Sequence, residues 1–310
     1  MTKFRFLPDD TNIGFMKYAK LAAMISSVAC IASVVLFFAV GLNFGIDFKG
    51  GTLIEIRTEQ KADIGSLRSK ISTLKLGDVE LQSFGSDRDV LIRVETQEGG
   101  EKKQRIAIER IRSVLGDSVE YRRVEVVGPK VSGELAREGT IAVIVAILAV
   151  MVYIWFRFEW QFAIGAVLSL SHDVLLTIGV FAILQIGFGL PIIAAILTIV
   201  GYSLNDTVVV YDRVRENLRK YKKKELPDII DMSLIQMLRR TILTSVSTLL
   251  ALGALYTFGG EVLRGFTFTM IWGVIIGTYS SIFIAAPLLI MTGARISDPI
   301  KPEGEAEETV

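Results

Sequence analysis

Long uncharged stretches separated by short charged ones dominate the sequence. The first, Leu21–Ile46, holds no Asp, Glu, Lys or Arg and exceeds the ~20 residues that a helix needs to cross a bilayer. Four more apolar regions follow residue 138: Gly139–Phe156, Trp160–Tyr211, Thr241–Gly260 and Gly265–Ala294. The longest, Trp160–Tyr211, is long enough to cross the bilayer twice, with a Gly/Pro-rich turn at 187–191 between the two crossings. The pattern predicts a polytopic α-helical membrane protein with six transmembrane helices, the first at 21–43 and five within 138–294.

Between the first two crossings, residues 44–137 have the polar, short-period pattern of a soluble domain. In one segment Ile64, Leu67 and Ile71 recur at spacings of three and four, which is typical of an amphipathic helix. The expected elements are strand Thr52–Thr58, helix Ala62–Lys75, strand Val79–Phe84, strand Asp89–Glu95, helix Gly100–Leu115 and strand Val119–Val127. The order βαββαβ predicts a ferredoxin-like α+β domain inserted between transmembrane helices 1 and 2.

Polar side chains recur at helical spacing inside three of the apolar spans. Each set lies on one face of its helix: Thr198, Tyr202 and Asp206; Ser169, Asp173 and Thr177; and Arg240, Thr244 and Thr248. Polar stripes of this kind face the interior of a helix bundle rather than lipid. We therefore expect these side chains to point into the bundle.

Asp206 is the residue whose surroundings matter most for function. A charged aspartate at bilayer depth costs about 2.5–3.5 kcal/mol even on lenient insertion scales. Burial favours its protonated form, whereas a nearby cation such as Arg240 favours its charged form. A carboxyl group held between these two states can take a proton from one side and release it to the other. We therefore hypothesise a proton relay in which movement of Arg240 switches Asp206.

Structural explanations stay open for each of these residues. Asp206 could be hydrogen-bonded permanently across helices, and Asp173 with the adjacent His172 could be structural as well. Arg240 lies at the end of its span and could only anchor the topology. The Gly-x-x-x-Gly pair at Gly273 and Gly277 indicates helix packing more often than chemistry.

Composition supports a membrane protein and excludes several classes of enzyme. The chain is 51% hydrophobic with a mean hydropathy of +0.48, too apolar for an ordinary soluble domain. Its one cysteine, Cys30, permits no internal disulfide, and its one histidine, His172, excludes a Cys/His zinc site. The sequence holds no phosphate-binding loop, zinc-protease helix or nucleophile elbow. We therefore expect no enzymatic activity, no cofactor and no metal, and a net charge of +1 gives no reason to expect nucleic-acid binding.

Lysine and arginine are concentrated in the connection between the fourth and fifth spans, residues 212–240. They are Arg213, Arg215, Arg219, Lys220, Lys222, Lys223, Lys224, Arg239 and Arg240. By the positive-inside rule this loop is cytoplasmic, and with six spans both termini lie on the same side. The N-terminal residues 1–20 then form a cytoplasmic segment, and the domain at 44–137 lies across the membrane. The acidic tail at 295–310 is expected to be disordered.

Short motifs spread along the chain resemble those of the SecD/SecF family. They occur in the family's order and are Gly45-Ile46-Asp47-Phe48-Lys49-Gly50-Gly51, Val127-Gly128-Pro129, Phe156-Arg157-Phe158-Glu159-Trp160, Ser171-His172-Asp173-Val174, Gly201-Tyr202-Ser203-Leu204-Asn205-Asp206, Arg213-Val214-Arg215-Glu216-Asn217, Arg240-Thr241 and Phe258-Gly259-Gly260. Together they are highly specific for the family.

The resemblance implies an accessory subunit of the Sec protein-export machinery in the bacterial inner membrane, with the soluble domain in the periplasm. Such a subunit works with SecD at the SecYEG channel and uses the proton motive force to complete the passage of preprotein. Membrane lipid is the other expected contact. The soluble insert is small, which implies that this chain is the family member that pairs with SecD and not SecD itself. The family belongs to the resistance-nodulation-division superfamily, in which two six-helix halves enclose charged residues, so SecD would supply the second half.

The resemblance also implies roles for particular residues. The family's relay aspartate falls on Asp206 and its partner arginine on Arg240. Further candidates for the proton relay are Asp173, His172 and Asn205, and the family signature falls on Asp47, Gly50, Gly51, Gly201, Tyr202 and Ser203.

Two other functions stay open. The chain could be half of a small-molecule or lipid exporter of the same superfamily, although those exporters usually carry larger extracytoplasmic domains. It could also be a scaffold that assembles membrane partners and transports nothing. The scaffold hypothesis predicts that Asp206→Asn leaves activity intact.

Overall fold

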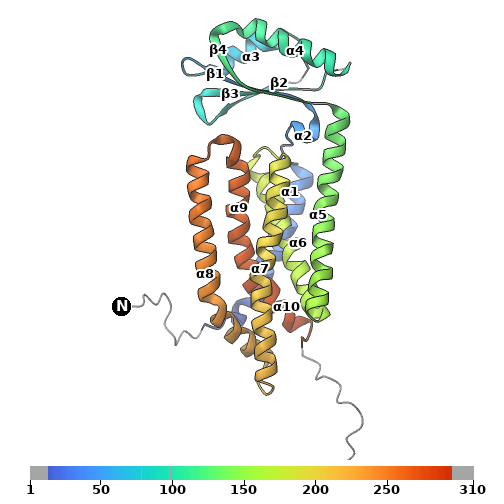
Figure 1. Cartoon of the computed structure of the whole chain (residues 1–310), viewed down its shortest axis with the longest axis vertical. Coiled ribbons are helices and arrows are strands. Elements are labelled where there is room, and N and C mark those ends of the chain that lie inside the picture. The colour runs from blue at the N-terminus through green and yellow to red at the C-terminus, as the bar shows by residue number, and fades with distance from the viewer. Residues whose placement is uncertain (1–12, 78, 98, 295–310) are drawn as a thin grey trace, which may run out of the picture.

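The computed structural model describes residues 13–77, 79–97 and 99–294. Within these ranges six helical segments are long and apolar enough to cross a membrane, as predicted. They are α1 (Ala19–Ala39, after the 3₁₀ turn Met16–Tyr18), α5 (Pro129–Arg157), α6 (Trp160–Leu184), α7 (Leu190–Lys220), α8 (Leu226–Phe258) and α9 (Glu261–Ser280), the last continued by the π-helix η3 (Ser281–Ala285) and by α10 (Ala286–Met291). They form one bundle with the soluble domain at one end (Figure 1).

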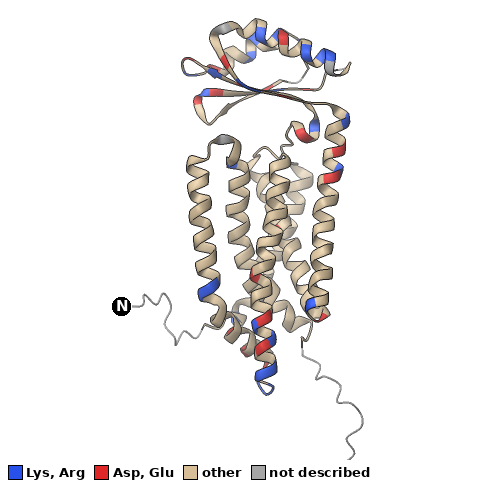
Figure 2. Ribbon diagram, in the orientation of Figure 1, with Lys and Arg blue, Asp and Glu red and all other residues tan. Residues whose placement is uncertain are grey.

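Charged residues are gathered at the two ends of the molecule. Figure 2 shows them in the soluble domain and at the opposite end of the bundle, while the helices between are almost free of charge. This uncharged band is what a bilayer requires, because each charge at bilayer depth costs several kcal/mol. The predicted segment 1–20 is described only from residue 13, and the predicted tail at 295–310 lies outside the described residues.

Two predicted connections differ in the structure. The second span starts at Pro129 rather than Gly139, so α5 runs out of the bundle and up to the soluble domain. The expected basic loop at 212–240 is mostly helix, because α7 continues to Lys220 and α8 begins at Leu226. These helical extensions pack on each other through apolar side chains among their basic ones, including the buried Val214, Ile230 and Leu234. Hydropathy alone hides such helices, because their average composition is polar.

The soluble domain is a four-stranded antiparallel sheet with two helices on one face. The elements are β1 (Gly51–Thr58), α3 (Ile64–Ser72), β2 (Val79–Phe84), β3 (Ser86–Val94), α4 (Gly100–Leu115) and β4 (Val119–Val127), with a short helix α2 (Ile46–Lys49) before them and a 3₁₀ turn (Gly116–Ser118) before β4. The predicted βαββαβ order is therefore present. The strands lie in the order β2-β3-β1-β4. The helices lie on the side away from the bundle (Figure 1), over a core that includes Ile54, Ile56, Ile71, Ile92 and Ile111.

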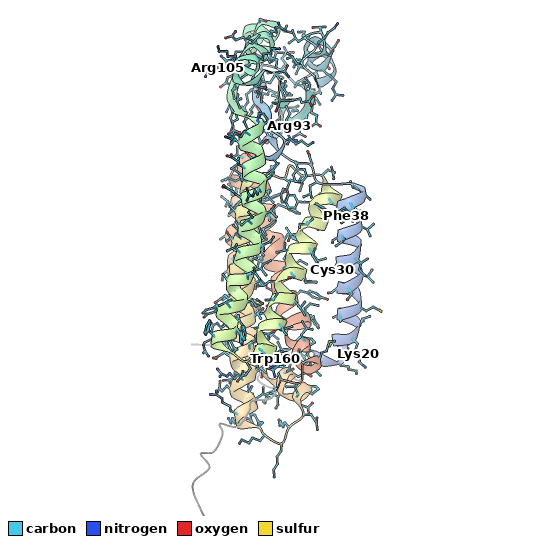
Figure 3. The ribbon with its side chains drawn as sticks, turned by 90° about the vertical axis from the view of Figure 1, so that its right-hand side faces the viewer. Lys20, Cys30, Phe38, Arg93, Arg105 and Trp160 are labelled. Carbon is cyan, nitrogen blue, oxygen red and sulfur yellow. The ribbon has the colours of Figure 1, made fainter. Side chains whose placement is uncertain are left out.

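Two segments join this domain to the bundle. One is α5, which follows β4 directly. The other is the chain between α1 and β1, which contains α2. Figure 3 shows α1, from Lys20 to Phe38, on the outside of the bundle, and Arg93 at the base of the soluble domain.

Candidate functional site

The candidate site is built around α7, which packs on several other helices. Pro191 lies in its first turn, where a missing N–H breaks no helical hydrogen bond. One face is buried along the helix and includes Ile199, Ser203, Asp206 and Val210. Because apolar and polar positions alternate on this face, packing of the apolar side chains carries the polar ones into the bundle.

Asp206 is buried but only partly hydrogen-bonded. Its Oδ1 accepts a hydrogen bond from the Thr241 hydroxyl of α8 at 3.1 Å. The other oxygen, Oδ2, is buried and has no hydrogen-bond partner among the described residues. A carboxylate is well stabilised in its charged form by two or three donors or by a close cation. The surroundings of Asp206 in this chain therefore stabilise its charge incompletely.

Arg240 precedes Thr241, the hydrogen-bond donor to Asp206, on α8. Among the described residues, no hydrogen bond joins Arg240 to the Asp206 carboxylate. The Arg240 side chain is exposed on the surface of the bundle. The arginine predicted from the sequence is thus the chain neighbour of the residue that donates to Asp206, and a relay role for Asp206 and Arg240 stays a prediction.

The polar stripes of α7 and α8 lie partly on the outer surface, which corrects the expectation that they face the interior. Thr198, Asn205 and Thr244 are exposed, as is the Gly201 position. Tyr202 is half-buried and its hydroxyl donates to Thr248 Oγ1 at 3.4 Å. Polar side chains at bilayer depth are stable only against protein or water. Within the described chain, no other element covers these exposed positions of α7 and α8.

The third stripe, on α6, points inward as predicted. Asp173 is almost fully buried, and its Oδ2 accepts hydrogen bonds from Ser203 of α7 at 2.6 Å and Ser280 of α9 at 2.9 Å. Its Oδ1 lies 2.9 Å from His172 Nδ1. His172 stacks on Tyr279, and its Nε2 is buried without a partner among the described residues. Asp173 thus ties three helices together.

A run of four hydroxyl residues in α9 and at the start of its π-helix was not singled out from the sequence. Thr278 and Ser245 of α8 lie 2.8 Å apart, and Tyr279 and Ser26 of α1 lie 2.9 Å apart. Ser280 donates to Asp173, and Ser281 lies 2.9 Å from Thr207 of α7. The run therefore makes hydrogen bonds to α8, α1, α6 and α7 in turn. Four adjacent hydroxyl side chains inside an apolar span were the available signal.

The signature glycines lie at the junction of bundle and domain. Gly50 and Gly51 have φ of +73° and +116°, a conformation that residues with a Cβ rarely adopt. At Gly51 a Cβ would lie 2.4 Å from the Val94 carbonyl oxygen. Asp47, the signature carboxylate, is on α2 and accepts a hydrogen bond from the Leu190 N–H at 2.9 Å. It therefore belongs to the far end of α7 and not to the Asp206 site.

Comparisons with protein families give two matches. The family model described as "Protein export membrane protein SecD/SecF, C-terminal" matches residues 107–295. A second model, the "SecD/SecF GG Motif", matches residues 35–62, which include Asp47 and the paired glycines.

Individual proteins are similar over nearly the whole chain. "Protein translocase subunit SecF" of Desulfurispirillum indicum is 44% identical over 93% of this chain and 94% of its own length. The protein of the same name from Vibrio alginolyticus is 42% identical over 98% of this chain and 97% of its own length.

Solved structures are similar too. The crystal structure of SecDF from Thermus thermophilus, a translocon-associated membrane protein, superposes with a TM-score of 0.84 at 32% identity. The match covers 93% of this chain but only 40% of that one. SecDF in a "super-membrane-facing form" gives a TM-score of 0.68 over the same coverage.

Proposed function

Since this chain belongs to the SecD/SecF family of protein export membrane proteins, we propose that it is a proton-coupled subunit of the Sec translocase. In this proposal it pairs with SecD, acts at the SecYEG channel in the bacterial inner membrane, and uses the proton motive force to complete preprotein translocation. Both termini are cytoplasmic and the soluble domain is periplasmic. The concentration of lysine and arginine at the end of the bundle opposite the domain supports this orientation.

The observation that carries the proposal is the incomplete site of Asp206. Thr241 donates to Oδ1, and the buried Oδ2 has no partner among the described residues. These contacts do not by themselves hold the carboxyl group in its charged form. Approach of the Arg240 guanidinium favours the charged form, and its withdrawal favours the protonated one. Relative movement of α7 and α8 would therefore load and release a proton at Asp206.

The outward polar face of α7 and α8 supports a second subunit. Asn205 is exposed within an apolar span, where lipid offers no hydrogen bonds, and Arg240 is exposed at the end of its span. SecD is the proposed partner because the solved SecDF chain contains a region like this one and is much longer. Carboxylates or other polar groups of SecD would then complete the surroundings of Asp206.

The inner cluster is proposed as a continuation of the relay. Ser203, which donates to Asp173, lies three residues before Asp206 on α7, so one helix carries both sites. The unpartnered Nε2 of His172 gives this cluster a position that can accept a proton. A proton taken up there would make His172 a cation and strengthen its hydrogen bond to Asp173 Oδ1.

The decisive experiment measures export of a preprotein with and without a proton gradient. The chain is purified together with SecD, and this complex is reconstituted with the SecYEG channel. Asp206→Asn and Arg240→Met should each remove the stimulation by the gradient. Asp173→Asn should lower it less, because Asn retains part of the hydrogen bonding. Thr257→Ala on α8, whose hydroxyl donates to Gly253 O of its own helix, is the control and should be normal.

Full gradient stimulation in both the Asp206 and Arg240 variants, at equal protein amounts, would rule out the relay. Loss of assembly with intact stimulation per complex would favour the scaffold hypothesis. Drug or lipid efflux defects without accumulation of preprotein would favour an exporter.

A further inference from the structure

The chain leaving α1 is bonded to the turn that starts α7. Phe44 and Phe188 form a parallel β-bridge. The Gly45 N–H donates to Phe188 O at 2.9 Å, and the Phe188 N–H donates to Asn43 O at 2.7 Å. The Asn43 side-chain amide donates to Gln185 O at 2.9 Å. We call these two segments, residues 41–50 and 185–190, the junction.

Asp47 performs the part of a helix cap at this junction. The first N–H groups of a helix have no partner within it, and the N-cap residue of α7, Gly189, has no side chain to offer. Asp47 supplies the missing acceptor from a segment 143 residues away, through Oδ2 to the Leu190 N–H at 2.9 Å. Its negative charge also suits the positive end of the helix dipole.

The absence of a side chain at Gly189 allows this contact. A Cβ at this position would lie 2.7 Å from Asp47 Oδ2, closer than such atoms approach in real proteins. Its φ of −123° is open to any residue, so backbone conformation does not explain the glycine. Close approach of the carboxylate does.

The junction is also tied to the soluble domain and to the core of the bundle. Arg93 of β3 donates from Nη1 to Asn43 Oδ1 at 3.0 Å. The rings of Phe44 and Phe48 each lie 6.0 Å from that of Phe188, which packs in one cluster with Ile192 of α7. The sheet, α2 and the first turn of α7 are therefore linked by continuous contacts.

We propose that Asp47 is a positioning residue that fixes the start of α7 to the soluble domain, so that movement of the domain displaces α7 and shifts Asp206 relative to Arg240. This inference rests on the proposed function. α7 is an unbroken helix from Leu190 past Asp206, a length of roughly 24 Å at 1.5 Å per residue. A displacement at its first turn is thus transmitted to the relay site.

The first test is the reconstituted export assay with substitutions of Asp47. Asp47→Ala should lower the stimulation by the gradient roughly fivefold, the factor that corresponds to loss of a helix cap. Asp47→Asn should keep most of it, because asparagine caps helices as well as aspartate. Asp63→Ala is the matched control, since Asp63 caps α3 within the domain by accepting from the Ser66 N–H, and its stimulation should be normal.

Hydrogen exchange gives a readout of the contact itself. In Asp47→Ala, peptides covering residues 186–194 should exchange faster, while those covering the start of α9 should not change. Unchanged exchange at 186–194 would overturn the capping role, as would a defect in Asp47→Asn equal to that of Asp47→Ala.

A covalent tie should replace the lost cap. The Cβ of residue 45 would lie 3.7 Å from Gly189 Cα, so cysteines at these two positions would lie close together. Gly45→Cys with Gly189→Cys, made in the Asp47→Ala chain that also carries Cys30→Ser, should regain gradient stimulation when oxidised and lose it when reduced. Failure of the oxidised chain to recover would contradict the proposal.

The two proposals fail separately. If Asp206→Asn keeps full stimulation, the proton-relay function is wrong. If Asp206→Asn abolishes stimulation but Asp47→Ala preserves it, the relay stands and only the positioning role of Asp47 is overturned.

Discussion

Asp173 and Asp206 are both buried carboxylates, yet they have different numbers of hydrogen-bond partners. Among the described residues, Asp173 has Ser203, Ser280 and His172 around it, whereas Asp206 has Thr241 alone. A carboxylate with three partners holds its charge more firmly than one with a single donor. Within the described residues, Asp206 is therefore the carboxylate with fewer hydrogen-bond partners, and the proposed relay rests on this difference.

Asp89 in the soluble domain shows the opposite case, a carboxylate fixed in its charged form. Arg57 donates to both of its oxygens, at 2.6 and 2.8 Å, and Ser86 donates to one at 2.7 Å. These hydrogen bonds, chiefly those from Arg57, lower the pKa of Asp89 to about 2. The side chain of Arg57 is 41% exposed, so water screens the pair and reduces its contribution to the free energy of unfolding.

The pKa of Asp89 predicts how domain stability depends on pH. The folded pKa lies below the unfolded value of about 3.9, so the contribution is complete above pH ~4 and is lost as the pH falls towards 2. Calorimetric unfolding of the purified protein should show wild type more stable than Asp89→Asn at pH 6, with the difference vanishing near pH 2. The exposed neighbour Asp87→Asn should not differ from wild type at either pH. A difference that stays constant over this range would contradict the assignment.

At the scale of elements, the contact between α7 and α9 depends on two glycines. A Cβ at Gly273 would lie 2.2 Å from Ile199, and one at Gly277 would lie 2.9 Å from Ser203. The Gly-x-x-x-Gly pair is thus a packing motif, as the sequence indicated. It brings α9 close enough for Ser280 and Ser203 to share Asp173.

Filling this contact should destabilise the bundle. Gly273→Leu forces a side chain into the space of Ile199, and we expect a loss of ~1–3 kcal/mol, measured as a lower thermal unfolding temperature in detergent. Gly253→Leu on α8 is the matched control, because a Cβ there meets nothing within 4 Å. Equal unfolding temperatures for the two variants would show that this packing is not tight.

The π-helix η3 is an element that hydropathy does not reveal. It begins at Ser281, directly after the α-helical residues that bond to α8, α1 and α6. Its last residue, Ala285, accepts a hydrogen bond from Tyr211 of α7 at 3.0 Å. π-Helical segments inside α-helices are frequent at functional sites, and this one bonds to α7 at both of its ends, through Ser281 and Ala285.

At the scale of the whole molecule, the bundle has two chemically different outer faces. α1 exposes apolar side chains such as Met24, Val28 and Ile31, which suit lipid. The face of α7 and α8 exposes Asn205 and Arg240 together with the bare position Gly201. The second face is therefore the one on which the proposed SecD partner would pack.

A bulky residue on that face should block assembly without harming the fold. At Gly201 a Cβ meets nothing within 4 Å, so Gly201→Trp should leave the unfolding temperature of the isolated chain unchanged. Co-purification with SecD should fall roughly tenfold, the effect of about 1.4 kcal/mol. Ile31→Trp on α1, where the side chain is 65% exposed, should co-purify normally. Normal assembly of the Gly201 variant would place the partner elsewhere.

The sequence by itself determined the six spans and the order of the soluble elements, and it singled out Asp206 and Arg240 as candidate site residues. These follow from hydropathy and periodicity, which are properties of neighbouring residues. The sequence did not predict that α7 and α8 continue beyond the expected spans. The buried apolar side chains of these extensions lie among many charged ones, so the average hydropathy there is low.

Only the tertiary structure decided which groups meet. Thr241 reaches Asp206 across 35 residues, Ser280 reaches Asp173 across 107, and Asp47 reaches Leu190 across 143. Serine and threonine are common in membrane helices, so their type does not mark those that bond between helices. The outward direction of the α7 and α8 stripes also could not be predicted from the sequence. Periodicity shows which residues share a face of a helix, but not whether that face is covered by this chain or by another.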